Sequence, residues 1–352
     1  MHVSIFGLTI SSSWGNGHAT LWRGLCRGLA ERGHQVTFFE RDVPYYAQHR
    51  DLQHWPDGEL QLYPSWEQLV PIARERLARS GAVIITSFCP DANPALELAE
   101  TYPGLKKAFY DMDTPVTLQS LAEGKEVAYL PPDGLRRYDT VLSFTGGPVL
   151  NALVERLRAR DVHVLFGHAD PEVHRPVALN AAYRSDLSYL GTFAADRQPA
   201  LERLFVAPAK QCVEKKFLLA GSLYPATFPW TPNIYFIPHL APPDHPAFFS
   251  SSALTLNVTR RAMAENGYCP PGRLFEAAAC GAPILSDVWD GLERFFLPGK
   301  EILLAETTED VLAVLSLPPA SLQQIGEAGR LRVLKEHTSQ ARARDLEQIL
   351  FA

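Results

Sequence analysis

Residues 2–39 decide the fold class, and they read HVSIFGLTISSSWGNGHATLWRGLCRGLAERGHQVTFF. The apolar run 2–7 predicts a buried strand. From about Gly17 onward, apolar side chains recur every three or four positions, which predicts a helix that ends at Gly33. The β-branched and aromatic run 36–39 predicts a second strand. Two parallel strands need such a crossover, so this opening indicates a βαβ unit and an α/β protein.

The alternation of strands and helices continues along the chain, with one interruption. A polar, proline-bearing stretch covers residues 167–186, after which the alternation restarts at residue 187. This pattern predicts two doubly wound parallel sheets. We expect an N-terminal domain at 1–178, a second domain at 179–335, and a C-terminal helical segment at 336–352. The expected strands after the first two lie at 82–88, 108–111, 140–145, 162–166, 187–191, 217–221, 234–237, 253–257, 283–287 and 301–305, and residues 321–350 are expected to be helical.

Composition excludes several classes of function. The chain has 352 residues, with 33 Lys and Arg against 39 Asp and Glu, a net charge of −6 without a basic run. That balance disfavours a nucleic-acid-binding role. No apolar stretch approaches the roughly 18 residues that span a bilayer. Five cysteines without a paired or metal-type spacing suit a reducing compartment, so we expect a cytoplasmic protein with no membrane span and no metal site.

The loop after the first strand carries the strongest candidates in the first half, because ligands of parallel sheets bind beyond the carboxyl ends of the strands. Residues 11–18 of this loop read SSSWGNGH. His18 at the helix start is suited to take a proton from a hydroxyl group, or it caps the helix or pairs with a carboxylate. Gly15 and Gly17 also resemble the start of a dinucleotide fingerprint, with Glu40 or Asp42 as its acidic residue, but Thr20 replaces its third glycine.

Three aspartates follow later strands of the first half. Asp91 is placed either to orient His18 or to cap the next helix. Asp111 and Asp113 form an Asp-x-Asp pair, which suits either a divalent cation on a diphosphate or a turn. Aromatic residues between 45 and 66 either form a stacking wall for an acceptor or simply pack a long loop.

The second half offers a candidate anion site. Its expected helix start at Gly272, together with Arg260 and Arg273, suits a diphosphate without a metal. Glu276, one turn further along, can accept both hydroxyls of a ribose. The alternatives are surface ion pairs for the arginines and a helix salt bridge for Glu276. Asn257 and Gly221, each at the end of an expected strand, and Gly17 in the loop of the first half complete the expected donor-binding set.

Longer stretches of the chain resemble the spore-maturation CgeB-type glycosyltransferases. The similarity covers nearly the whole chain and is carried by DLSYLGTFAADR at 186–197, NVTR at 257–260, RLFEAAACG at 273–281, SDVWDGL at 286–292, SWGNGHAT at 13–20, YDMDTPVT at 110–117 and SFTGGP at 143–148.

This resemblance implies a GT-B fold, in which two Rossmann-like domains face a cleft. The first domain would bind the acceptor, the second would bind the nucleotide-sugar donor, and the final helix would return to the first domain. It implies that Glu276 binds the donor ribose and that His18 lies where inverting enzymes carry their base, with Asp91 near the position of its partner. The chain departs from the family pattern at Tyr268, where many members have glutamate, and at residues 269–272, CPPG, where relatives read Ser-Pro-Ser.

We therefore expect a glycosyltransferase that moves a sugar from a UDP-, GDP- or dTDP-sugar to the hydroxyl of a small molecule or glycan, without a cofactor or metal. The expected catalytic residues are His18, as the base, and Asp91 or Asp111, as the carboxylate that orients it, and Trp14 and Asp113 are expected to bind the acceptor. A GT-B-type nucleotide-sugar epimerase and a non-catalytic nucleotide-sugar-binding protein remain alternatives. A nicotinamide oxidoreductase ranks last.

Overall fold

The computed structural model describes residues 1–351, which divide into two compact units. Unit 1 contains residues 1–166 together with the C-terminal segment from residue 339, and unit 2 contains residues 167–338. The sequence analysis placed these divisions after residues 178 and 335. Each unit is described by itself below.

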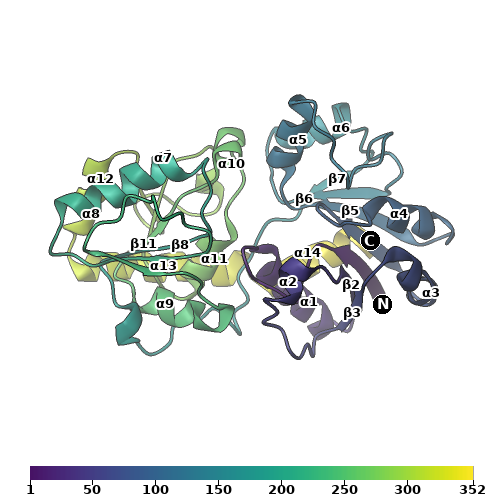
Figure 1. Ribbon diagram of the computed structural model, residues 1–352, viewed down its shortest axis with the longest axis horizontal. Coiled ribbons are helices and arrows are strands. Elements are labelled where there is room, and N and C mark those ends of the chain that lie inside the picture. Colours follow the sequence, from purple (N-terminus) through teal and green to yellow (C-terminus); the bar gives the residue numbers. More distant parts are fainter. Residues whose placement is uncertain (352) are drawn as a thin grey trace. The chain divides into compact units, whose positions relative to one another are not determined.

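Unit 1 contains a seven-stranded parallel sheet in the order β3-β2-β1-β4-β5-β6-β7 (Figure 1). Its strands are β1 (His2–Gly7), β2 (Gln35–Arg41), β3 (Glu59–Tyr63), β4 (Ala82–Thr86), β5 (Lys106–Asp111), β6 (Thr140–Ser143) and β7 (Val162–Val164). The central strands are apolar along their length because both faces of the sheet are covered. Successive residues of β2 show this: Phe39 stacks on Phe6, whereas Phe38 packs edge-on against Trp22 of the first helix on the other face.

Helices cover both faces of this sheet. They are α1 (His18–Glu31), α2 (Pro44–Ala47), α3 (Trp66–Leu77), α4 (Ala92–Glu100), α5 (Thr114–Ala122), α6 (Val149–Glu155) and α14 (Ser339–Phe351). Helix α1 buries the predicted apolar stripe and ends just before Gly33, whose φ of +82° suits a residue after a helix.

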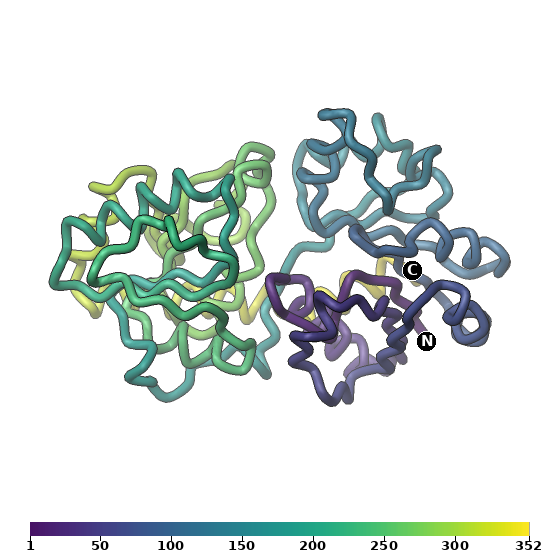
Figure 2. The backbone as a smooth tube through the Cα atoms, in the orientation of Figure 1, coloured from purple at the N-terminus to yellow at the C-terminus, as the bar shows by residue number. Residues whose placement is uncertain are grey.

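Helix α14 packs against α1, although the two lie at opposite ends of the chain; Figure 2 shows the yellow C-terminal segment beside the purple α1. Gly28 of α1 makes this approach possible, because a Cβ there would lie 2.8 Å from the carbonyl oxygen of Ser339. Glu347 pairs with Arg32 at the same contact.

Unit 2 contains a six-stranded parallel sheet in the order β10-β9-β8-β11-β12-β13. Its strands are β8 (Leu187–Leu190), β9 (Phe217–Ala220), β10 (Ile234–Ile237), β11 (Thr255–Asn257), β12 (Ile284–Ser286) and β13 (Leu303–Leu304). Its helices are α7 (Gln198–Leu201), a π-helical turn (Glu202–Val206), α8 (Ala207–Gln211), α9 (His245–Ser251), α10 (Arg261–Asn266), α11 (Gly272–Ala279), α12 (Thr308–Leu315) and α13 (Pro319–Glu336).

The structure differs from the sequence expectations in two elements. The expected helix at 321–350 is two helices, because His337 leaves the helical conformation and Thr338 pairs with Ala169 in unit 2 before α14 begins. Strand β3 was not predicted, and it extends the edge of the first sheet beside β2. The other strands lie within one or a few residues of the predicted positions, so the predicted alternation is confirmed. Within residues 1–351, no helix has both the length and the apolar character that crossing a bilayer requires.

Candidate functional site

Each sheet has one point where the strand order reverses direction, and ligands of such sheets bind beyond the carboxyl ends of the strands there. In unit 1 this point lies between β1 and β4, and in unit 2 it lies between β8 and β11. His18 and Asp113 lie at the first of these places and Asn257 and Arg273 at the second, whereas Asp91 and Arg260 have other partners. The first two pairs form one cluster in each unit.

His18 begins α1, directly after the loop that follows β1. Its Nε2 lies 3.0 Å from Oδ2 of Asp113, which follows β5, and both side chains stay partly exposed, at 18% and 15%. The backbone N–H of His18 donates to Oδ1 of Asn16 at 3.0 Å. Because Nε2 faces a carboxylate, Nδ1 is the ring nitrogen left to accept a proton. The sequence analysis named Asp91 or Asp111 as the partner of His18, whereas the structure pairs it with Asp113.

Asp111 lies behind this pair. The side chain is fully buried, and its Oδ1 accepts the backbone N–H of Asp113 at 3.1 Å. Burial raises the pKa of Asp111 to about 7, although the Thr117 and Ser87 hydroxyls act in the opposite direction. Asp111 therefore holds the backbone that presents Asp113 and does not reach His18 itself. Asp111 and Asp113 also do not face one cation together, since one is buried and the other pairs with an imidazole.

Asp91 lies in a different network from His18. It occupies the residue before α4 but makes no side-chain capping bond there. Its carboxylate accepts from Nη1 of Arg41 at 3.2 Å and from the hydroxyl of Tyr63 at 3.0 Å. These contacts link the carboxyl ends of β2 and β3 to α4, so Asp91 has a structural role in unit 1.

Glu40 organises the loop that delivers His18. It is fully buried at the end of β2 and accepts four hydrogen bonds: from the backbone N–H of Ile10 and of Ser11, and from the Thr9 and Ser11 hydroxyls. In a dinucleotide site the acidic residue at this place must be available to a ribose. Here both oxygens of Glu40 bind the protein's own loop, and Asp42, the other acidic candidate, pairs with Arg50, so Glu40 has no oxygen left for a ribose.

The remaining loop residues leave room beside His18. A Cβ added to Gly17 would meet nothing within 4 Å. Trp14 stacks on His49 with ring centroids 4.1 Å apart, so the indole has a fixed orientation. Phe88 lies two residues after the end of β4, its ring centroid is 6.5 Å from that of His18, and it adopts a φ of +61°. A non-glycine residue in this conformation is strained, and such strain concentrates at functional sites.

The aromatic segment does not form a continuous wall. Tyr45 and Tyr46 lie in the short helix α2, where Tyr45 is 49% exposed. Tyr63 is buried and bonded to Asp91, and Trp66 packs against Phe6 in the core. Most of this segment therefore packs the protein.

In unit 2 the central residue is Arg273, at the start of α11. Its Nη1 donates to Oδ1 of Asn257 at 3.0 Å and to the carbonyl of Val258 at 3.3 Å, and the guanidinium lies over the ring of Tyr189. Burial lowers the pKa of Arg273, and the neighbouring charge of Arg197 acts in the same direction. No carboxylate in residues 1–351 forms an ion pair with Arg273.

Asn257 is held in place from the other side by Asp287. The Asp287 carboxylate accepts the backbone N–H of Thr259 at 2.9 Å, the Thr259 hydroxyl at 3.0 Å and Nδ2 of Asn257 at 3.3 Å. Burial raises the pKa of Asp287. This network fixes the amide so that its oxygen points at Arg273, and it connects the ends of β11 and β12.

Gly221 and Gly191 let two strand ends approach closely. A Cβ at Gly221 would lie 2.0 Å from the carbonyl oxygen of Gly191, and its φ of +152° is one that other residues rarely adopt. A Cβ at Gly191 would lie 2.9 Å from Nη2 of Arg273. Both glycines are therefore required for the geometry around Arg273.

Arg260 lies at the start of α10, and its Nε pairs with Asp196 at 3.3 Å with 43% of the side chain exposed. It thus makes the surface ion pair that the sequence analysis gave as the alternative. It remains a candidate donor ligand on the rim, whereas Arg273 lies at the switch point.

Glu276 lies one turn beyond Arg273 and is 7% exposed. Its Oε1 is 3.9 Å from Nε2 of His174, and its Oε2 is 3.9 Å from Nδ1 of His245. Burial lowers the pKa of both histidines to about 4. Neither histidine was singled out from the sequence.

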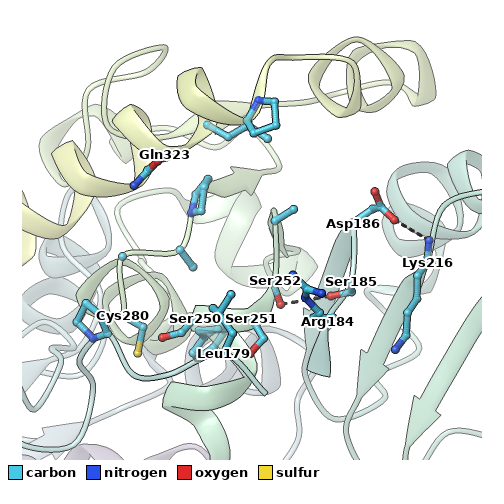
Figure 3. Close-up of a pocket in the computed structure, with 18 of the residues that line it drawn as sticks. Leu179, Arg184, Ser185, Asp186, Lys216, Ser250, Ser251, Ser252, Cys280 and Gln323 are labelled. Carbon is cyan, nitrogen blue, oxygen red and sulfur yellow. Dashed lines mark hydrogen bonds between the residues drawn. The ribbon is translucent and has the colours of Figure 1, made fainter. Parts of the chain in front are cut away.

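A separate pocket of about 1200 Å³ lies at the opposite edge of the second sheet (Figure 3). Its lining includes Asp186, Lys216 and Pro283, which directly precede β8, β9 and β12. It therefore opens at the amino ends of the strands, away from Arg273.

Sequence reasoning missed several residues of these clusters. Asp287, Tyr189 and Gly191 stand at or near strand ends, and Arg197 lies beside Arg273. The available signal was position, because a polar or glycine residue directly after a predicted strand is a site candidate in a parallel sheet. His174 lies in the polar stretch, where no such position rule applies.

Comparisons with known proteins agree with this description. Residues 197–348 match the family model described as glycosyl transferase-like. No curated protein matches the chain in sequence. The family match lies mainly in unit 2 and contains Arg260, Arg273 and Glu276.

Solved structures match over the whole chain. Sucrose-phosphate synthase from Thermosynechococcus elongatus has a TM-score of 0.73 at 17% identity, covering 99% of this chain and 98% of that one. HepE from Anabaena, in complex with UDP and glucose, has a TM-score of 0.69 at 11% identity, with 99% of both chains covered. An α-glucosyltransferase in complex with UDP has a TM-score of 0.69 at 12% identity, with 100% of both chains covered. A structure of an α-glucosyltransferase with UDP and DNA also matches.

These matches confirm the predicted fold class: the chain has a GT-B fold made of two Rossmann-like domains. Together with the family match they support a GT-B glycosyltransferase family. The narrower CgeB-type assignment stays a prediction.

Proposed function

We propose that this protein is a glycosyltransferase that moves a sugar from a nucleotide-sugar to an acceptor hydroxyl. One observation carries the proposal: Arg273, at the switch point of unit 2, has hydrogen bonds and a ring contact but no carboxylate partner within residues 1–351. The charges of Glu276 and Asp287 act on Arg273, but neither carboxylate forms an ion pair with it, and a partly buried charge without a direct partner is costly. A diphosphate would supply that counter-ion, and UDP is the nucleotide in the HepE and α-glucosyltransferase complexes.

The donor side of the reaction belongs to unit 2. Arg273, held by Asn257 over Tyr189, would bind the diphosphate through its fork of N–H groups. As the bond between the anomeric carbon and the phosphate oxygen breaks, negative charge grows on the departing nucleoside diphosphate. A fixed guanidinium stabilises that charge without reorganising, which is the electrostatic contribution that often dominates catalysis.

The acceptor side belongs to unit 1. With Nε2–H donating to Asp113, His18 offers Nδ1 to the acceptor hydroxyl. The oxygen forms a bond to the anomeric carbon as its proton passes to Nδ1, and the imidazolium later releases that proton to solvent. Asp113 stabilises the imidazolium, and Asp111 positions Asp113 through its backbone N–H. Trp14, fixed by His49, is a candidate surface for the acceptor.

The proposal needs no cation on the diphosphate. Asp111 and Asp113, which the sequence analysis considered for such an ion, do not face one ion together, because Asp111 is buried and Asp113 pairs with the His18 imidazole. Transfer at the same rate with and without added Mg²⁺ is therefore expected. The acceptor is proposed to be a small molecule or glycan, because the chain has a net charge of −6 and lacks a basic run.

The test is release of nucleoside diphosphate from a panel of UDP-, GDP- and dTDP-sugars, with and without pooled hydroxyl acceptors. A transferase should release diphosphate much faster when the right acceptor is present. Isomerised sugar from the donor alone would instead indicate an epimerase. Tight binding without any turnover would indicate a non-catalytic binding protein.

A further inference from the structure

Three side chains of unit 2 that are far apart in the sequence meet in one enclosed place. His174 comes from the stretch before β8, His245 begins α9, and Glu276 lies on α11. One ligand atom from each lies within 4.8 Å of the other two. The side chains are 4%, 12% and 9% exposed, so bulk water does not solvate the cluster freely.

The spacing is too wide for direct hydrogen bonds. Each imidazole nitrogen lies 3.9 Å from a different oxygen of Glu276, whereas an N–H···O bond needs about 2.7–3.2 Å. Neither ring nitrogen of His174 has a hydrogen-bond partner by distance and angle, and neither does Nδ1 of His245. Two imidazoles and a carboxylate thus converge without bonding each other.

The orientation of His245 gives a second reason to expect a ligand between these side chains. Its Nε2 lies 3.3 Å from the carbonyl oxygen of Leu240, which can only accept, so Nε2 carries the proton and Nδ1 presents a lone pair toward Glu276. A lone pair facing a carboxylate oxygen is repulsive unless a proton or a metal cation lies between them, and the 3.9 Å separation is longer than a hydrogen bond through a proton. A backbone carbonyl that binds the outer N–H of a histidine is also the usual support of a metal-ligating imidazole.

We propose that His174, His245 and Glu276 form a binding site for a divalent transition-metal cation of the zinc class. Two imidazoles and one carboxylate suit Zn²⁺ better than Mg²⁺ or Ca²⁺, which prefer oxygen ligands. In a tetrahedral site with bonds of about 2.1 Å, neighbouring ligand atoms lie about 3.4 Å apart. The two nitrogen–oxygen distances of 3.9 Å exceed this spacing by about 0.5 Å, and the widest pair of ligand atoms, within 4.8 Å, exceeds it by at most about 1.4 Å, so the side chains would have to move inward to close on an ion.

The cation would join three elements of unit 2. It would fasten the stretch that contains His174 to α9 and α11, and it would occupy Glu276, the residue that the family resemblance assigns to the donor ribose. The cluster shares Glu276 with the expected donor site, but neither His18 nor Arg273 belongs to it.

The experiment measures Zn²⁺ binding to the whole chain in the absence of nucleotide, so its outcome does not depend on the proposed function. Chelator-treated protein is titrated with Zn²⁺ by calorimetry, and Co²⁺ is added separately to look for visible absorption of a tetrahedral site. We expect one Zn²⁺ per chain and the Co²⁺ signal. His174→Ala and His245→Ala should each weaken Zn²⁺ binding by at least about 100-fold, since removal of a ligand should cost no less than loss of an outer-shell partner.

The matched control is His163→Ala, which removes a half-exposed histidine that pairs with Asp161 in unit 1 and should leave Zn²⁺ affinity unchanged. Circular dichroism checks that the variants are folded, and Glu276→Gln, which keeps the shape of the side chain, should also lose the Co²⁺ signal. Equal Zn²⁺ uptake by the wild type and the two histidine variants would overturn the proposal. So would the absence of a stoichiometric site in the wild type.

Discussion

At the residue scale, the chemistry rests on one pair, His18 and Asp113, and on the buried carboxyl group behind it. The pair is partly exposed, as a base that meets a substrate must be. Asp111 is fully enclosed and acts through the backbone of Asp113. The two aspartates of one short motif therefore have different environments and different proposed roles.

His18→Ala should lower kcat for transfer by about 10²- to 10⁴-fold, the range that a positioned general base contributes. Asp113→Asn should lower kcat less, because the imidazole remains but loses its counter-charge. Nucleotide affinity should stay unchanged in both variants, since Arg273 and its partners belong to unit 2. Steady-state kinetics and calorimetry with the nucleoside diphosphate check this; full transfer activity in His18→Ala would show that the base is wrongly assigned.

Asp111 should impose a pH dependence on stability. Burial raises its pKa from 3.8 to about 7, so between those values the folded chain binds more protons at this carboxyl group than the unfolded chain does. Its contribution therefore makes the free energy of unfolding decrease as pH rises through this window, by up to about 1.4 kcal/mol per pH unit.

Asp111→Asn removes that titration and keeps the shape of the side chain. Urea unfolding of both proteins from pH 4 to pH 8 isolates the effect, because all other groups titrate in both. The stability of the variant relative to the wild type should rise with pH up to about 7 and then level off. Parallel curves would mean that Asp111 is ionised as in water.

At the scale of elements, the loop between β1 and α1 decides where His18 lies. Glu40 at the end of β2 binds this loop through four hydrogen bonds at 2.6–2.9 Å. The loop thus has a fixed shape although it has no regular secondary structure. Its order comes from one buried carboxylate.

Glu40→Gln should disturb this loop, because an amide N–H₂ would face backbone N–H groups that need an acceptor. We expect a loss of about 1–3 kcal/mol in the free energy of unfolding, the usual cost of leaving buried polar groups unpaired. Transfer activity should fall as His18 loses its position. Asp42→Asn, on an exposed residue that pairs with Arg50, is the matched control and should change stability little. Equal effects of the two substitutions would contradict the role of Glu40.

Much of the element pattern was predictable from the sequence, and the side-chain partnerships were not. The apolar runs at 82–86 and 217–220 predict buried strands from local sequence alone, and both runs are strands in the structure. The pairing of His18 with Asp113 depends on the order of β1, β4 and β5 in the sheet, which local sequence does not encode. Strand β3 was missed because only its last residue is buried, so its pattern looked like an aromatic loop.

At the scale of the whole molecule, the chain leaves unit 1 after residue 166 and returns to it at residue 339. Helix α14 then completes unit 1 by packing on α1. The fold that holds the candidate acceptor-binding residues of unit 1 therefore depends for its stability on the last residues of the chain.

Gly28→Leu tests this dependence. A side chain at Gly28 would overlap the carbonyl of Ser339 and the Cβ of Ala343, 2.8 and 2.9 Å from the new Cβ. Overpacking of this kind typically costs about 1–3 kcal/mol, so the thermal midpoint should fall. Gly28→Ala should have a smaller effect in the same direction. A midpoint unchanged by both substitutions would show that α14 is not held tightly against α1.

The most direct test of the account is calorimetric binding of UDP, GDP and dTDP to the wild type, to Arg273→Lys and to Arg261→Ala. Arg261 is the control, because it is 75% exposed and pairs with Glu265 on the surface of the same unit. The account predicts that one nucleoside diphosphate binds the wild type and Arg261→Ala equally, and binds Arg273→Lys at least about tenfold more weakly because the two-pronged N–H contact is lost. Equal affinity of all three proteins for that nucleotide, or no binding of any nucleoside diphosphate to the wild type, would contradict it.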